Sequence, residues 1–86
     1  MTEEFFTWLR AQPREATVDA LDGYACVGFQ FLAANDYPVE YCGVGFWRDT
    51  SGQGHTFPEE IRRLINWAFG CGVLTYGELI DKAAGQ

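Results

Sequence analysis

The residues of this sequence that could do chemistry are one cysteine and the one histidine. Cys26 lies near the start of an expected helix, where backbone N–H groups lower the pKa of a thiol, and His55 falls on a later strand. A cysteine nucleophile with a histidine base is the general layout of cysteine hydrolases. The layout is incomplete, because we place Cys26 about one turn inside the helix, where Ala25, Val27 and Phe29 indicate burial. We therefore expect no enzyme, with a small cysteine hydrolase using Cys26 and His55 as the alternative.

The other cysteines do not complete a metal or disulfide site. The chain has an odd number of cysteines without CxxC spacing, which argues against a disulfide framework and against a four-ligand zinc site; they are Cys26, Cys42 and Cys71. Their apolar or small neighbours predict reduced, buried thiols. We expect neither a metal ion nor a cofactor.

Two pairs of adjacent charged residues have simple explanations. Glu59 and Glu60 fall in the expected first turn of a helix, where the helix dipole accounts for them without acid–base catalysis. Arg62 and Arg63 follow on the same helix without interleaved aromatic residues, and the net charge of the chain is −6. We therefore expect no direct binding to nucleic acid.

The acidic residues are unevenly distributed along the chain. Residues 1–47 hold seven acids and two bases, a net charge of −5, whereas residues 48–86 hold five acids and four bases, a net charge of −1. If the carboxylates of the first half gather in space, they would attract a basic groove and compete with nucleic acid for it. The residues that we expect on such a surface are Asp19, Asp22, Asp36 and Glu40. The alternative is that the acids only keep an apolar-rich chain in solution.

Aromatic residues offer a second kind of binding feature. Phe46 and Trp47 point to opposite faces if their strand is regular, so one of the two should be less buried. Tryptophan is enriched in binding hot spots, especially beside arginine, and Trp47 precedes Arg48. Trp47 is thus a candidate anchor for a partner, with a place in the core as the alternative.

Composition and periodicity predict a single α+β domain over residues 1–86. With 48% hydrophobic residues, the chain can bury enough surface to fold despite its charge. It has neither a signal-peptide start nor an apolar run long enough for a membrane, so we expect a cytoplasmic monomer or homodimer. The expected order is α-α-β-β-α-α, about four short helices around a two- or three-stranded antiparallel sheet.

The expected elements follow from caps and periodicity. Thr2 caps a first helix that closes before Pro13, and a loop with at most one helical turn follows up to Leu21. Asp22 caps a central helix that runs to about Ala34. The remaining elements are a strand over Val39–Trp47, a return strand over His55–Phe57, a helix with a Thr56/Glu59 capping box that ends at Gly70, and a last helix with a Thr75/Glu78 capping box.

Part of this pattern resembles small proteins encoded by bacteriophages and prophages. The resemblance rests on FxxWLxxQP at residues 5–13, then Asp19, Asp22, Cys26 and QFL at residues 30–32, with the TYG at residues 75–77. It covers about half of the chain, and its motif consists mostly of packing and capping residues. It implies a small acidic protein that binds and inhibits a basic protein of the bacterial host. Such a target would be a nucleic-acid-handling complex, as for anti-CRISPR proteins and DNA mimics; a virion assembly or structural subunit is a further alternative.

Overall fold

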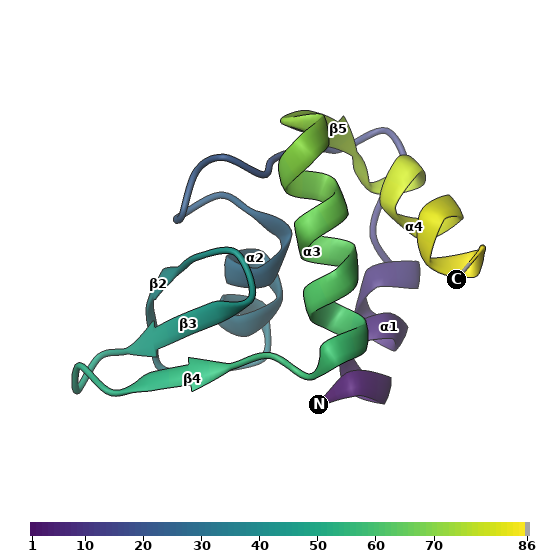
Figure 1. The fold of residues 1–86 in the computed structure, drawn as a ribbon. Coiled ribbons are helices and arrows are strands. Elements are labelled where there is room, and N and C mark those ends of the chain that lie inside the picture. Colours follow the sequence, from purple (N-terminus) through teal and green to yellow (C-terminus); the bar gives the residue numbers. More distant parts are fainter. Residues whose placement is uncertain (86) are drawn as a thin grey trace.

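The computed structural model describes residues 1–85, and residue 86, which the predicted domain includes, lies outside the described residues. The described chain is an α+β domain, as predicted, with four helices and five strands (Figure 1). In chain order they are α1 (Thr2–Arg10), β1 (Thr17–Asp19), α2 (Val27–Ala34), β2 (Val39–Cys42), β3 (Phe46–Asp49), β4 (Gly54–Thr56), α3 (Glu59–Cys71), β5 (Val73–Thr75) and α4 (Tyr76–Ala84).

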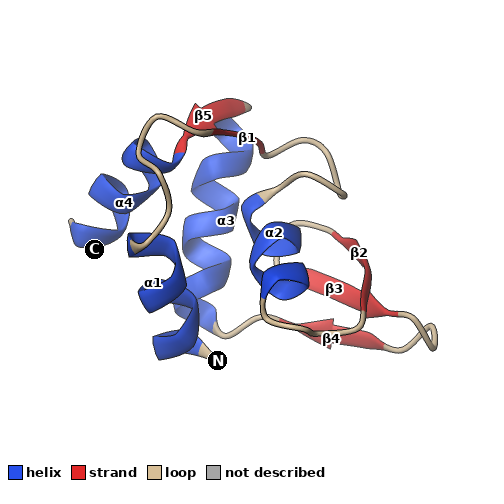
Figure 2. Ribbon diagram, turned by 180° about the vertical axis from the view of Figure 1, so that it is seen from behind, coloured by secondary structure: helices blue, strands red, loops and turns tan. Residues whose placement is uncertain are grey.

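The strands form two antiparallel sheets at different ends of the molecule. The three-stranded sheet has the order β2-β3-β4, and α2 packs against β2 (Figure 2). The second sheet is the pair β1 and β5, with Val18 opposite Leu74. Helix α3 lies between the sheet with α2 and the pair α1 and α4 (Figure 1).

The predicted return strand is present as β4, but two other predictions about the strands are wrong. The single strand expected over Val39–Trp47 is wrong, because the chain reverses at Gly43–Gly45 and continues as a separate strand, β3. Gly45 has φ 91°, a backbone conformation that L-residues with a side chain rarely adopt, so glycine makes this reversal possible. The segment expected as a loop before Leu21 contains β1, which finds its partner more than fifty residues later in β5.

Three predicted helix starts are also wrong. Helix α2 has its N-cap at Cys26, four residues later than predicted, because Asp22 instead closes a turn: its carboxylate accepts the N–H of Tyr24 at 2.8 Å. Helix α1 has Met1 at its N-cap position, and α3 has Pro58 there, without a side-chain cap bond in either case. The capping box of Thr75 and Glu78 at the start of α4 is confirmed.

The end of α2 has a backbone explanation that involves Asp36. Asp36 has φ 63°, in the left-handed region that Asp and Asn enter more readily than other residues with side chains. The N–H of Tyr37 donates to Leu32 O at 3.0 Å and the N–H of Asp36 to Ala33 O at 3.4 Å. These are the two bonds of a Schellman motif, and the ring of Tyr37 packs on Phe31 with 5.9 Å between centroids, as such motifs favour.

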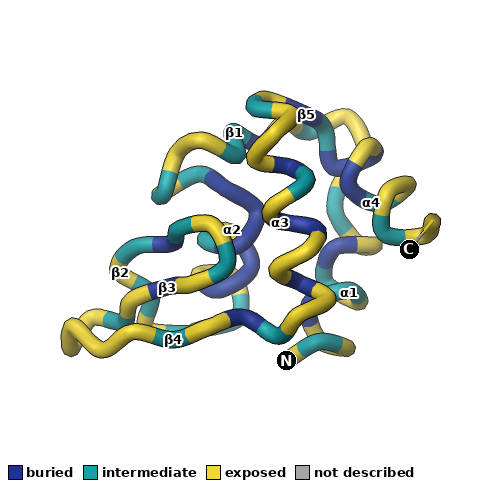
Figure 3. Tube along the Cα trace, viewed as in Figure 1, coloured by how far each residue is buried: buried dark blue, intermediate teal, exposed yellow. Residues whose placement is uncertain are grey.

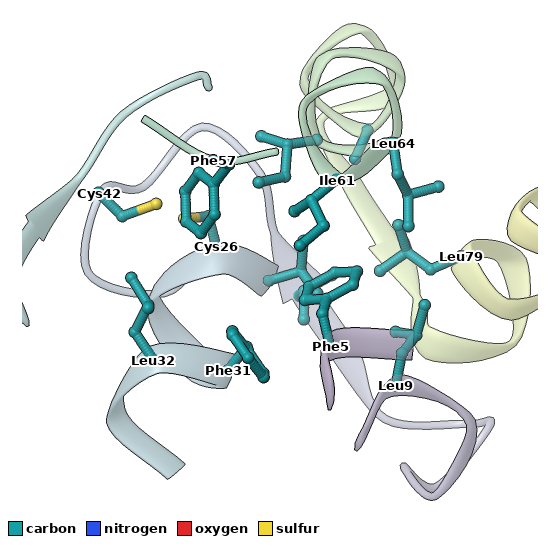
Figure 4. Packing of buried hydrophobic residues seen from close by; sticks show 14 of the residues in the cluster. Phe5, Leu9, Cys26, Phe31, Leu32, Cys42, Phe57, Ile61, Leu64 and Leu79 are labelled. Atoms are coloured by element: carbon teal, nitrogen blue, oxygen red, sulfur yellow. The ribbon is translucent and has the colours of Figure 1, made fainter. Parts of the chain in front are cut away.

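The core includes residues from the three-stranded sheet with α2, from α3, and from the pair α1 and α4. Burial recurs with helical period along α3 and at two pairs of residues along α2 (Figure 3). The largest side chains without solvent exposure come from all four helices and include Phe5, Leu9, Phe31, Leu32, Ile61, Leu64 and Leu79 (Figure 4). The buried side of α2 carries Val27, Gly28, Phe31 and Leu32.

Gly28 is the point where α2 comes closest to the sheet. A Cβ at Gly28 would lie 2.7 Å from Cys42 Sγ, 3.1 Å from the Phe57 ring and 3.3 Å from Ile65 Cδ1. Contacts of this kind leave no room for a methyl group without a shift of β2 or α3. The absence of a side chain at Gly28 therefore sets the distance between α2 and β2.

We predict that Gly28→Ala destabilises the fold by about 1–3 kcal/mol, because overpacking outweighs the better helix propensity of alanine. Gly70 in α3 is the matched control, since a Cβ there meets nothing within 4 Å. Gly70→Ala should be neutral or stabilising by up to about 1 kcal/mol. Urea unfolding of both variants measures the difference, and equal midpoints would show that the close approach of α2 to β2 is not required.

Candidate functional site

The exposed apolar side chains of the molecule gather around one pocket. Among residues 1–85, seven large apolar side chains are exposed, and four of them line a pocket between the loop after β1, the β2–β3 turn and the end of α3. The four are Leu21, Val44, Phe46 and Phe69. Tyr24 joins them through Tyr41, another lining residue, with 5.7 Å between ring centroids. We call the surface formed by Leu21, Tyr24, Tyr41, Val44, Phe46 and Phe69 the apolar face.

Glycines bring the aromatic rings of this face close to the backbone. A Cβ at Gly23 would overlap the Tyr41 ring, and a Cβ at Gly43 would overlap the Phe46 ring. The two rings are neighbours, with 6.4 Å between their centroids. Each ring thus packs closely against the loop or turn next to it.

Asp19 and Asp22 shape the loop that presents two members of the apolar face. Asp19 Oδ1 accepts the N–H of Leu21 at 3.0 Å, and Asp22 Oδ1 accepts the N–H of Tyr24 at 2.8 Å. Each carboxylate therefore fixes an apolar residue two positions further along the chain. Neither belongs to an ion pair within residues 1–85, so both leave their negative charge beside the apolar face.

The other expected acidic residues are placed differently. Asp36 follows the C-terminal end of α2 whereas Asp22 precedes its N-terminal end, and eight helical residues separate such ends by about 12 Å. Glu40 lies on β2 and accepts a hydrogen bond from Arg48 at 3.2 Å, which compensates its charge. Of the four predicted acids, only Asp19 and Asp22 lie together in one loop beside the apolar face.

Trp47, the predicted anchor, belongs to the core. Its side chain is 4% exposed, whereas Phe46 is 49% exposed, so the expectation that the two differ in burial is confirmed. The indole stacks on the ring of His55 with 4.2 Å between centroids and contacts Tyr37 edge-on. Phe46, and not Trp47, is therefore the exposed residue of the pair.

His55 is held away from Cys26 by this stack. In the three-stranded sheet, Cys42 is opposite Trp47, and Trp47 is opposite His55, so an indole separates the imidazole from the sulfur of Cys42. The Nε2 atom of His55 lies 2.8 Å from Asp49 Oδ2. The arrangement gives Cys26 no contact with the imidazole that a cysteine hydrolase would use as its base.

Cys26 occupies the N-cap position of α2, and not a place one turn inside the helix as predicted. Its sulfur and that of Cys42 point toward one another beside Phe57 (Figure 4). Hydrogen bonding from Cys42 lowers the pKa of Cys26 to about 7, and the N–H groups of Phe29 and Gly28 act in the same direction against the effect of burial. Both cysteines line the pocket of the apolar face.

The predicted burial of the cysteines is correct for two of the three. Cys26 and Cys42 are buried, but Cys71 is exposed in the last turn of α3, next to Gly72 with φ 76°. The sequence places Cys71 among small residues, and nothing in that pattern distinguishes it from the other two.

The pocket at the apolar face is small. Its volume is about 270 Å³, below the range of about 300–1,000 Å³ that is usual for small-molecule sites. A wider hollow of about 560 Å³ lies between α1, α3 and α4, lined by apolar side chains and by Arg10, Glu60 and Arg63. The described lining of that hollow contains no cysteine or histidine, whereas the smaller pocket combines two cysteines with exposed apolar side chains.

Comparisons with known proteins give no match: no protein-family model, no curated protein and no solved structure is similar to this chain. Within the described part of the chain, no three His, Cys, Asp or Glu side chains are placed to hold a metal ion. None of the described helices has the length and apolar character needed to cross a membrane.

The pair Asp49 and His55 predicts how acid affects the fold. Hydrogen bonds from His55 and Ser51 hold the pKa of Asp49 well below its usual range. A carboxylate with a depressed pKa in the folded state stabilises the protein fully above its unfolded pKa, near about 4, and loses that contribution as the pH falls further. Asp49→Asn should therefore be less stable than the parent at about pH 6, with a difference that shrinks toward about pH 2.

Urea unfolding of both proteins across this pH range measures the difference. His55→Ala removes the largest cause of the lowered pKa of Asp49. Like Asp49→Asn, this variant should therefore lose less stability than the parent as the pH falls. A stability difference between parent and Asp49→Asn that stays constant over the whole range would contradict this account.

Proposed function

We propose that this chain is a small protein-binding domain that uses the apolar face to bind a basic partner. The observation that carries the proposal is the gathering of Leu21, Val44, Phe46 and Phe69 around one pocket. Exposed apolar patches with a polar rim are typical of protein interfaces, and aromatic residues are enriched at their centres. A pocket of about 270 Å³ accommodates one apolar side chain of a partner better than a free small-molecule substrate.

The charges beside the face indicate the chemistry of the partner. Asp19 and Asp22 leave two negative charges on the loop that carries Leu21 and Tyr24. At the other end, Arg62 lies against Gly45, next to Val44. A segment with an apolar side chain for the pocket and Lys or Arg toward Asp19 and Asp22 fits this arrangement, and the overall charge of −6 favours its approach.

The resemblance to phage proteins supplies the biological part of the proposal. A small acidic protein of this kind would bind and inhibit a basic protein of the bacterial cell, such as a nucleic-acid-handling complex. The proposed contact surface differs from the predicted one, because Leu21, Phe46 and Phe69 replace Trp47 as the anchors. Asp36 and Glu40 leave the expected acidic set, because one lies at the far end of α2 and the other pairs with Arg48.

The first test removes the apolar anchors. Phe46→Ser combined with Phe69→Ser truncates two exposed rings at little cost in stability, since both are about half exposed. We expect the affinity for a partner captured from a bacterial lysate to fall at least about tenfold, equal to about 1.4 kcal/mol, because aromatic anchors dominate such interfaces. Binding is measured on the captured partner after purification, and undiminished affinity would refute the proposed surface.

The second test removes the charge and keeps the loop. Asp19→Asn combined with Asp22→Asn retains the Oδ1 acceptors for the N–H groups of Leu21 and Tyr24. We expect slower association and a weaker dependence on salt than in the parent. Glu3→Gln combined with Glu60→Gln removes the same charge from exposed helix positions elsewhere and should leave the association rate closer to that of the parent. Equal effects of both double variants would show that only net charge matters.

A further inference from the structure

Two cysteine side chains face one another at the floor of the pocket. Cys26 is the N-cap residue of α2, and Cys42 ends β2, which packs on that helix. Cys42 Sγ lies over Gly28 in the first turn of α2, where even a methyl group would come within 2.7 Å of it. The close-up shows the two sulfur atoms pointing toward each other (Figure 4).

The backbone holds both cysteines in this position. The N–H of Cys42 donates to Gly23 O at 3.1 Å, and the N–H of Cys26 donates to Asp22 O at 2.9 Å. Both acceptors belong to the same turn before α2. These hydrogen bonds connect the end of β2 to the turn that leads into α2. They therefore limit how far the two sulfur atoms can separate.

The pair has the unequal acidity that thiol chemistry needs. Hydrogen bonding with Cys26, burial and the negative charge of Cys26 raise the pKa of Cys42, whereas the pKa of Cys26 is lowered to about 7. The charge of Cys26 also affects Tyr76 of α4. Burial and this charge raise the pKa of Tyr76 to about 12, so its hydroxyl stays neutral. Cys26 is thus the more acidic thiol of the pair, whereas Cys42 keeps its proton near neutral pH.

We propose that Cys26 and Cys42 form a redox-active dithiol that reduces small hydroperoxides and closes to an intramolecular disulfide. The Cys26 thiolate attacks the terminal oxygen of the hydroperoxide, the O–O bond breaks, and the leaving alkoxide or hydroxide takes a proton to become an alcohol or water. Cys26 is then a sulfenic acid. Cys42 attacks its sulfur, the S–O bond breaks, water leaves, and a Cys26–Cys42 disulfide remains.

The pocket selects the size of the oxidant. The exposed fractions of Cys26 and Cys42 are 4% and 1%, and the pocket of about 270 Å³ is the hollow that reaches them. Hydrogen peroxide and short alkyl hydroperoxides fit this space, whereas a bulky disulfide does not. Cys71 is exposed and separate from the pair, so the two cysteines of the pocket are distinguishable from the third by their accessibility.

The test uses hydrogen peroxide on the folded chain in a Cys71→Ser background, which removes intermolecular coupling through the exposed thiol. After an approximately stoichiometric dose, we expect the loss of both remaining thiols and a mass lower by two hydrogen atoms. Cleavage after Glu40 places Cys26 and Cys42 on different fragments, so only a disulfide between them keeps these fragments joined until reduction. The same dose on the urea-unfolded chain should react at least about tenfold more slowly, because an ordinary thiol with a pKa of about 8.5 is mostly protonated at pH 7.

Two single variants separate the steps. Cys42→Ser should stop at a sulfenic acid on Cys26 that dimedone traps, and Cys26→Ser should form neither product at Cys42. Circular dichroism shows whether each of these two variants is folded. The disulfide test on the Cys71→Ser chain uses neither variant, so it remains decisive if one of them fails to fold. Equal rates in the folded and unfolded chain, or fragments that separate without reduction, would overturn the proposal. Partner binding is not measured in this experiment, so its outcome is independent of the proposed function.

Discussion

The contact between the first turn of α2 and the end of β2 determines most of what is distinctive in this protein. Gly28 lets Cys42 Sγ, the Phe57 ring and Ile65 meet over the helix, and these residues come from β2, the segment after β4 and α3. One residue without a side chain thus brings three separate parts of the chain together. Because α2 is only eight residues long, a shift at this contact would move the whole helix.

The same contact explains why reactive and apolar groups occur together. Since α2 begins only at Val27, residues 20–26 form a loop of turns that lies over the end of β2. The loop turns Leu21 and Tyr24 outward while Cys26 points inward at the helix start. This loop therefore contributes both to the apolar face and to the cysteine pair, and a change in the covalent state of Cys26 would act directly on the floor of the pocket.

Local signals in the sequence predict much of the fold, and they fail where distant residues decide. The α+β class, the Thr75/Glu78 capping box, the exposed position of one residue of the Phe46–Trp47 pair and the end of α2 at Ala34 follow from periodicity and capping. The pairing of β1 with β5 does not, because each strand has only three residues and the alternation is too short to recognise. Asp22 resembles an N-cap in sequence, yet its carboxylate closes a turn with the N–H of Tyr24.

The candidate site was harder to predict, because its members have no common spacing. Leu21, Val44 and Phe69 come from a loop, a turn and a helix end, and each alone is an ordinary exposed apolar residue. Phe69 continues the helical spacing of the buried stripe of α3, so periodicity predicts burial and gives no signal of its exposure. The acidic residues do share a pattern in the sequence, a stretch without basic residues, and this pattern predicted one common surface. In the structure, Asp36 adopts the left-handed conformation that ends α2, and Glu40 forms an ion pair with Arg48. A carboxylate thus adds uncompensated negative charge to the apolar face only where it lies beside that face and belongs to no ion pair of the described chain, as Asp19 and Asp22 do.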